Sequence, residues 1–184
     1  MKKRVLASRY AKALLLLAQS EGKTDEYAEE MRRFMVAFEE DSEIKKALLG
    51  PIFDAVERKR IVREMADLLT LSRAIKNFLQ ILIAKERMGE IKSIFEAYRN
   101  MADEIAGRVR VKIRSATTIP PNLFAKIREQ VQRMVKKEVI LEVEIQPDLI
   151  GGLVAKINNI LIDGSVRGQI VRLREKLESA LGGD

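Results

Sequence analysis

The sequence predicts an α+β protein, in which an N-terminal six-helix bundle is followed by a small C-terminal α+β domain. Apolar residues recur at helical spacing from Val5 to Ala106, without strand-type alternation. Strict period-two alternation begins in RVRVKIR, residues 108–114, and returns in ILEVEIQ, residues 140–146. Gly107 separates the two patterns, so we expect an N-terminal domain over 1–106 and a C-terminal domain over 107–184.

Glycine, proline and short polar residues divide the first domain into helices. Gly22, Gly50-Pro51 and Met88-Gly89 are expected to end or interrupt helices. Expected N-caps are Thr24 or Asp25 for the second helix, Asp41-Ser42 for the third and Ser72 for the fifth. The expected helices are 5–20, 24–40, a short one between 42 and 50, 53–69 in two pieces, 73–87 and 90–106.

The second domain reads as β-α-β-β-β-α. In its first strand Val109, Val111 and Ile113 share one face, and in the second Leu141, Val143 and Ile145 are expected to point inward. Pro120-Pro121 opens a helix over 122–137, and Pro147 ends the second strand. Two short strands, 153–157 and 160–162, are expected to pair through a tight turn at Asn158-Asn159, before a last helix.

Composition excludes several classes of function. The chain of 184 residues contains no cysteine and no histidine, which excludes disulfides, thiol nucleophiles, Ser-His-Asp triads and metal sites built on these side chains. No paired carboxylates stand beside a recognisable substrate loop, since most acidic residues lie among basic ones at helical spacing. We therefore expect no catalytic residue, no bound metal and no cofactor, and a protein that is not an enzyme.

No targeting or membrane-spanning segment is predicted. Residues 1–4 are basic, but no signal-peptide core follows them, and ALLLLA is far shorter than the about 20 apolar residues that a bilayer requires. We expect a soluble protein of the cytoplasm or a similar compartment.

The formal net charge of +7 suggests a nucleic acid, an acidic lipid or an acidic protein as partner. RVRVKIR places four basic residues on one strand face, which fits a nucleic-acid surface or a solvated strand. ILEVEIQ carries Glu142 and Glu144 on its own outer face, so the charges would pair if the strands are neighbours. Because no aromatic residue interleaves with the basic ones, the solvated strand is the favoured interpretation.

LIDGSVRGQIVRLREKL, residues 161–177, could cradle a phosphate or simply turn a strand into a capped helix. Ser165 is well placed as an N-cap, and Val166, Ile170, Leu173 and Leu177 form one apolar stripe. The Gly-x-x-x-x-Gly-Lys-Ser/Thr spacing of a P-loop is missing. The structural interpretation is therefore favoured.

The first and fifth helices carry more apolar surface than one core-facing stripe needs. A core-type stripe is expected at Leu6, Tyr10, Ala13, Leu14 and Leu17, with Leu15 and Leu16 to its side. In the fifth helix Phe78, Leu79 and Leu82 suit a core, and Ile81 and Ile83 spread beyond it. The surplus indicates either a helix at the centre of the bundle or a groove for a partner helix.

Three strings resemble the delta subunit of F-type ATP synthases, the family of the mitochondrial oligomycin sensitivity-conferring protein. They are ASRYAKALLLLA, NFLQILIAKERMGEIKSIFEAY and PDLIGGLVAKINNILIDGSVRGQIVRLREKL, in the family's order and over nearly the whole chain. The resemblance implies a helical bundle followed by an α+β domain. It also implies a non-catalytic stator subunit of the peripheral stalk, which links the catalytic head to b-type stalk subunits and resists the torque of the rotor during proton transport.

The resemblance also implies partners and sites. The first domain would hold the N-terminal helix of an alpha subunit in a groove between the first and fifth helices, and the second would meet the ends of b-type subunits. The groove residues are expected to be Tyr10, Ala13, Leu14, Leu17, Phe78, Leu82 and Ile83. The stalk-facing or fold-determining motif is expected at Gly151, Gly152, Asp163, Gly164 and Arg167.

The chain departs from the family where Lys85-Glu86-Arg87 replaces a frequent Asn-Gly-Arg, so the turn after the fifth helix is expected to differ. The implied location is peripheral, on the cytoplasmic face of the cell membrane within the complex. An alternative of another class is an RNA-binding helical module of the transcription antitermination type, which would use the basic excess.

Overall fold

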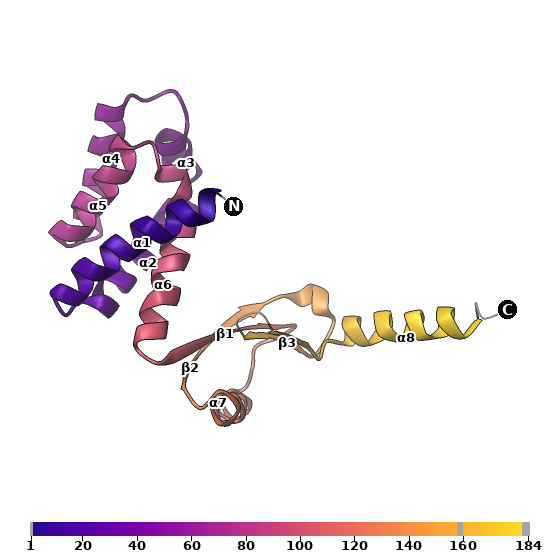
Figure 1. Ribbon diagram of the computed structural model, residues 1–184. Coiled ribbons are helices and arrows are strands. Elements are labelled where there is room, and N and C mark those ends of the chain that lie inside the picture. The colour runs from indigo at the N-terminus through magenta and orange to yellow at the C-terminus, as the bar shows by residue number, and fades with distance from the viewer. Residues whose placement is uncertain (1, 158–159, 182–184) are drawn as a thin grey trace. The chain divides into compact units, whose positions relative to one another are not determined.

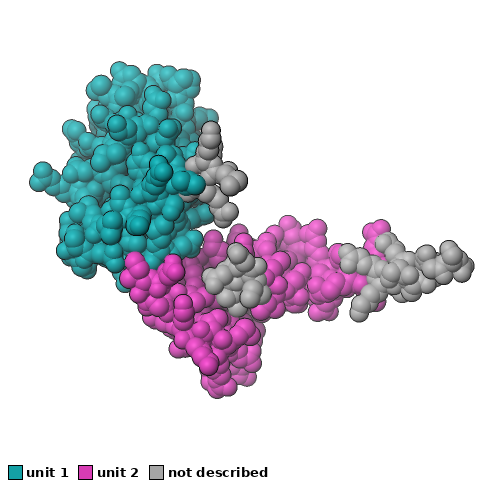
Figure 2. Space-filling model, in the orientation of Figure 1, with its two compact units in different colours: residues 1–102 teal, residues 103–184 magenta. Residues whose placement is uncertain are grey.

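The computed structural model describes residues 2–157 and 160–181 of the chain. It divides into two compact units, residues 1–102 and 103–184 (Figure 2). The expected boundary lay at 106/107, a few residues later. Asp103, the first residue of the second unit, accepts hydrogen bonds from Arg110 of the same unit.

Unit 1 is helical throughout its described length, and the connections between its helices are short (Figure 1). Its elements are α1 (Lys2–Ser20), α2 (Thr24–Glu40), α3 (Ser42–Leu49), α4 (Ala55–Leu68), α5 (Arg73–Ala84), the 3₁₀ turn η1 (Met88–Glu90) and α6 (Ile91–Ile105). No helix among the described residues is long and apolar enough to cross a membrane.

Side-chain caps begin several of these helices. The Asp41 carboxylate accepts hydrogen bonds from two backbone N–H groups of α3, and the Ser72 hydroxyl accepts one from α5, as predicted. The prediction for α2 was wrong, because its N-cap residue is Lys23, which forms no side-chain cap. The expectation of two pieces over 53–69 was also wrong, since α4 is one helix that begins with a capping box formed by Asp54 and Glu57.

Three helices of unit 1 end in Schellman motifs, but only one of them has glycine at the left-handed position. Gly22 takes φ +68° after α1, whereas Thr70 takes φ +52° after α4 and Glu86 takes φ +55° after α5. At each end the two backbone N–H groups that follow the cap donate to carbonyls of the last turn. The turn after α5 therefore adopts the left-handed backbone despite lacking the glycine of Asn-Gly-Arg.

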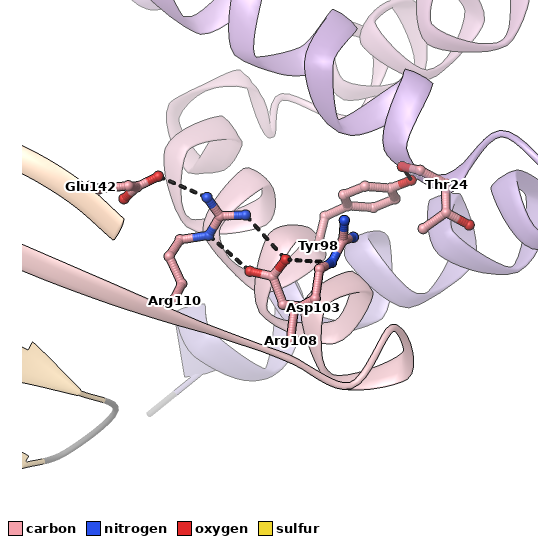
Figure 3. A network of polar contacts seen from close by, with 6 residues as sticks. All are labelled: Thr24, Tyr98, Asp103, Arg108, Arg110 and Glu142. Atoms are coloured by element: carbon pink, nitrogen blue, oxygen red, sulfur yellow. Dashed lines mark hydrogen bonds and ion pairs between the residues drawn. The ribbon is translucent and has the colours of Figure 1, made fainter. Parts of the chain in front are cut away.

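The core of unit 1 combines aliphatic side chains with two buried tyrosines. Burial and a hydrogen bond to Glu21 raise the pKa of Tyr27 to about 12. Tyr98 donates its hydroxyl proton to the Thr24 carbonyl oxygen at 2.9 Å, which ties α6 to the start of α2 (Figure 3). The largest fully buried side chains of this core are Tyr27, Met31, Phe34, Leu48, Ile75, Leu79, Leu82, Ile83, Ile91, Ile94 and Tyr98.

Unit 2 has the predicted β-α-β-β-β-α order, which confirms the α+β fold. Its elements are β1 (Arg108–Ser115), α7 (Pro121–Val135), β2 (Glu138–Ile145), the 3₁₀ turn η2 (Pro147–Leu149), β3 (Leu153–Ile157), β4 (Ile160–Asp163) and α8 (Val166–Leu181). The sheet order is β2-β1-β3-β4, with β1 and β2 parallel through the α7 crossover and the other pairs antiparallel. The predicted turn at Asn158-Asn159 lies outside the described residues.

The predicted inner face of β1 packs against α7. Val109, Val111 and Ile113 are buried with Val131 of α7 and Val139 of β2. In β2 only part of the prediction holds, because Leu141 packs on this cluster whereas the side chains of Val143 and Ile145 are exposed. β2 is an edge strand, so its side chains have a neighbouring strand on one side only.

The outer face of β1 carries the basic residues, and one of them is held by two carboxylates. Arg110 donates to Asp103 from Nε at 2.8 Å and from Nη2 at 3.1 Å, and to Glu142 Oε1 at 2.9 Å (Figure 3). β1 and β2 are direct neighbours in the register Lys112–Glu142 and Arg114–Glu144. Charge pairing between these strands, which the solvated-strand interpretation required, is therefore present for Arg110.

Candidate functional site

Two surfaces of the molecule contain the residues singled out from the sequence, one in each unit. The first lies along α1 and α5. These helices touch through Tyr10 and Phe78, whose rings meet edge to face with centroids 6.5 Å apart. Ala13 and Leu17 lie on the same helix as Tyr10, seven residues or less from it, and their side chains are exposed.

The remaining groove candidates are core residues. Leu14 is 2% exposed, Leu82 is fully buried and Ile83 is 2% exposed, so they offer little surface to a partner. Phe78 is also buried, although its ring contacts the half-buried Tyr10. These four side chains belong to the core of unit 1, so the exposed residues of α1 and α5 are other ones.

The predicted core stripe of α1 was partly wrong. Ala13 and Leu17 were expected to face the core and are exposed, whereas Leu15 was expected beside the stripe and is buried. The buried stripe is Ala7, Ala11, Leu14, Leu15 and Ala18. Its three alanines let the helix backbone approach its neighbours closely. A core face made largely of alanine is not indicated by a pattern of large apolar residues.

Two further apolar residues of these helices, which were not among the predicted groove residues, are also exposed. Leu16 of α1 is 57% exposed and Ile81 of α5 is 49% exposed. Ala13, Leu16, Leu17 and Ile81 are thus exposed apolar residues on two helices that contact each other through Tyr10 and Phe78. The sequence placed Leu15, Leu16, Ile81 and Ile83 beside the expected stripes, and of these Leu16 and Ile81 are exposed whereas Leu15 and Ile83 are buried.

The second surface is the junction between β4 and α8. Asp163 Oδ1 accepts hydrogen bonds from the Ser165 backbone N at 2.9 Å and from Ser165 Oγ at 2.7 Å. Ser165 Oγ in turn accepts from the Gly168 N–H at 3.0 Å, which confirms Ser165 as the N-cap of α8. Hydrogen bonds from the Ser165 side chain and backbone lower the pKa of Asp163, and Arg172 and Arg114 contribute through their charge.

The glycines of this junction are required by close backbone contacts. Gly152 has φ +76°, and a Cβ atom there would lie 2.4 Å from the Gly164 carbonyl oxygen. The Gly151 carbonyl accepts from the Val166 N–H at 2.9 Å, and Gly164 N–H donates to the Leu153 carbonyl at 3.0 Å. The motif therefore holds β3, β4 and the start of α8 together.

One further glycine acts here that the sequence analysis did not single out. A Cβ atom at Gly168 would lie 2.4 Å from Asp163 Oδ2, so any other residue at that position would require the Asp163 carboxylate to move. The carboxylate occupies the helix N-terminus, where a phosphate would otherwise bind, and like charge repels a phosphate. The structural interpretation of residues 161–177 is therefore the better one.

Beyond the junction, α8 exposes apolar side chains. Val166, Ile170 and Leu173, three members of the predicted stripe, are exposed, and the side chain of Leu177 lies outside the described residues. Arg167, the last of the motif candidates, is also exposed. A stripe of this width that is not covered by its own chain is typical of a helix that packs on a partner.

Nothing in the described part of the chain resembles a metal or catalytic site. No group of three or more aspartate or glutamate side chains that could hold a metal is found among those residues. A hollow of about 480 Å³ in unit 1 is lined by Leu48, Leu49, Gly50, Pro51, Arg58, Ile83, Glu86, Met88 and Gly89. This lining is mainly apolar and has one acidic and one basic side chain, an arrangement with no nucleophile and base pair.

Comparisons with known proteins agree on one family. The family model described as ATP synthase delta (OSCP) subunit matches residues 6–177. The chain is 35% identical to ATP synthase subunit delta of Desulforapulum autotrophicum, with 97% of each chain covered. It is 36% identical to the subunit delta of Desulfatibacillum aliphaticivorans, again with 97% of each covered, and 33% identical to that of Myxococcus xanthus, with 94% and 96% covered.

A solved structure shows the same fold. A chain of the Toxoplasma gondii mitochondrial ATP synthase hexamer aligns with a TM-score of 0.72 at 14% identity, covering 94% of this chain and 97% of its own length. The RNA-binding alternative finds no support in these comparisons. With nearly all of its length matched by the family model and by relatives above 30% identity, the chain belongs to the ATP synthase delta (OSCP) subunit family.

Proposed function

We propose that this chain is a non-catalytic peripheral-stalk subunit of an F-type proton-translocating ATP synthase. It joins the catalytic head to b-type stalk subunits and resists the torque of the rotor, on the cytoplasmic face of the membrane. Family membership supports this role, and so does the presence of one partner-type surface in each unit. A subunit that links two parts of a complex without catalysis requires stable binding surfaces rather than an active site.

The single observation that carries the proposal is the exposed apolar surface of α1 and α5. Ala13, Leu16, Leu17 and Ile81 are exposed on two helices joined by the Tyr10–Phe78 contact. An amphipathic helix from the N-terminus of an alpha subunit would bury its apolar anchors against these side chains. Leu14, Phe78, Leu82 and Ile83 would act from below, by keeping the two helices at a fixed separation.

The second unit would bind the stalk. Its b-type partners are helical chains, and α8 offers them Val166, Ile170 and Leu173. The junction residues Gly151, Gly152, Asp163 and Gly164 would fix the direction in which α8 leaves the sheet, and the exposed Arg167 would contact the partner directly.

A calorimetric titration of the full chain with a synthetic N-terminal helix of the same organism's alpha subunit tests the head contact. We expect one-to-one binding in the nanomolar range, about −12 kcal/mol, with little dependence on salt because apolar burial drives it. Leu17→Asp should weaken binding at least about a hundredfold, since it places a charge in the buried centre of the contact.

Leu68→Asp is the matched control, because Leu68 is an 85% exposed leucine of α4. It should bind the alpha helix like the wild type. Failure of the folded wild-type chain to bind would contradict the proposed function. Equal effects of the two substitutions would show that the α1–α5 surface is the wrong site.

A further inference from the structure

The outer face of the unit 2 sheet, the face opposite α7, contains two lysines directly beside each other. The antiparallel register of β1 and β3 places Lys112 opposite Lys156. Both side chains are exposed. Directly opposed residues have Cβ atoms about 5 Å apart, and like charges in such pairs destabilise a sheet.

Other basic residues of this face have polar partners within the sheet or at the end of α6, whereas these two lysines have none among the described residues. Arg110 binds Asp103 and Glu142, and Arg114 donates from Nη1 to Gln146 Oε1 at 3.4 Å. Glu142 is the β2 neighbour of Lys112 in the register, yet it accepts from Arg110 at 2.9 Å. Within residues 5–156 and 161–174, neither lysine forms an ion pair or a hydrogen bond.

The surroundings of the pair favour a protein partner over a polyphosphate. Glu142 and Glu144 lie on the same face on β2, and Asp163 lies there on β4, so a continuous phosphate backbone would meet carboxylates on either side. Leu161 of β4 stands beside Lys156 in the register and is 56% exposed. The cross-strand row Glu142–Lys112–Lys156–Leu161 therefore ends in an exposed leucine side chain. It contains no aromatic residue on which a nucleic-acid base could stack.

We propose that Lys112 and Lys156 dock a carboxylate-bearing helical segment of a b-type stalk subunit, an inference that rests on the proposed function. Two carboxylates at i and i+4 on a helix have Cβ atoms about 6 Å apart, which matches the spacing of the opposed lysines. An apolar residue of the same helix then covers Leu161. The carboxylates of the partner then offset the repulsion between Lys112 and Lys156 that is present in the unbound chain.

The test is a calorimetric titration of the full chain with the soluble part of the same organism's b-type subunit. Lys112→Glu and Lys156→Glu should each weaken binding about tenfold, because each replaces an attraction by a repulsion. Lys126→Glu is the matched control with the same change in net charge, since Lys126 is exposed on α7, on the other side of the sheet. It should bind within about twofold of the wild type, and salt should weaken wild-type binding because the contact is ionic.

A second measurement separates loss of the contact from loss of the fold. Lys156→Glu replaces a like-charge cross-strand pair by an opposite-charge pair, so the thermal midpoint of the free chain should rise relative to the wild type. Weaker binding by a more stable chain identifies the lysine pair as a docking point. A lower midpoint for this variant would contradict the premise that the pair is unfavourable in the free sheet.

Three outcomes would overturn the proposal. If the wild type binds the b-type subunit and both reversals bind like Lys126→Glu, the docking point is wrong while the stalk function stands. If the wild type does not bind, the proposed stalk role fails, and the lysine proposal with it. If the reversals abolish retention on anionic vesicles or on an RNA oligonucleotide but leave the b-type titration unchanged, the chemistry of the partner is wrong.

Discussion

Asp103 in the last turn of α6 and Arg110 in β1 form a two-point contact, with Nε and Nη2 of the guanidinium donating to the two carboxylate oxygens at 2.8 and 3.1 Å (Figure 3). The Asp103 side chain is only 7% exposed. Glu142 of β2 binds the same guanidinium, so a helix end and two strands meet at one charged group. Such bidentate pairs are the geometrically specific form of ion pair.

Asp103→Ala should therefore destabilise unit 2 by about 2 kcal/mol, because it leaves a partly buried guanidinium with one carboxylate instead of two. Chemical denaturation of the full chain measures the change. Glu129→Ala is the control, since Glu129 pairs with Arg133 on the exposed surface of α7 and should contribute less than about 0.5 kcal/mol. Equal losses for the two variants would contradict the importance of the buried contact.

Thr70 and Glu86, which have positive φ at the ends of α4 and α5, are positions where a glycine substitution should stabilise the protein. Thr70→Gly and Glu86→Gly should each raise the free energy of unfolding by about 1 kcal/mol, because a side chain at positive φ is strained and glycine is not. Gly22→Ala, at the same position of the Schellman motif after α1, should lower it by about the same amount. Thermal and denaturant unfolding of the three variants would show whether the signs are opposite.

Gly168 offers a test in which helix propensity and tertiary structure predict opposite signs. Alanine is normally better than glycine inside a helix by about 1 kcal/mol. At Gly168 the added methyl would meet the Asp163 carboxylate and displace it from Ser165, so Gly168→Ala should lower stability by about 1–2 kcal/mol. A stabilised variant in denaturant unfolding would show that the carboxylate can move without loss of the N-cap.

The free energy of unfolding should fall at alkaline pH because of the buried Tyr27. Its pKa is raised to about 12 in the folded chain, by burial first and by its hydrogen bond to Glu21 second. An unfolded tyrosine ionises near pH 10, so the contribution of Tyr27 is complete below about pH 10 and is lost as the pH rises toward 12.

Tyr27→Phe should therefore lose less stability than the wild type between about pH 10 and about pH 12, as measured by denaturant unfolding at each pH. The pKa of Tyr98 is raised in the same direction, by burial first and by the charge of Asp25 second, and both of these causes are present in the two proteins. Parallel curves for the two proteins over this range would contradict the altered pKa of Tyr27.

Much of the candidate site could be predicted where its causes are local. Ser165 was identified as an N-cap because the cap depends on a hydroxyl three residues before the N–H that it accepts from. Strand alternation placed the opposite charges of β1 and β2 on the outer face of each strand, whereas the pairing of the two strands is a feature of the tertiary structure. The exposed face of α1 was misplaced, because nothing local distinguishes Ala7 and Ala11 from Ala13.

The sequence by itself determined the order of helices and strands, the N-caps at Asp41, Ser72 and Ser165, and the inner face of β1, because each depends on residues close together in the chain. The tertiary structure alone decided which stripe of α1 is buried. It also decided that Glu142 accepts a hydrogen bond from Arg110, although its register neighbour is Lys112. In α1 it buries Ala7, Ala11 and Ala18 and leaves Leu17 exposed. These outcomes follow from close packing and from competition between partners distant in sequence, and a one-dimensional pattern does not contain either.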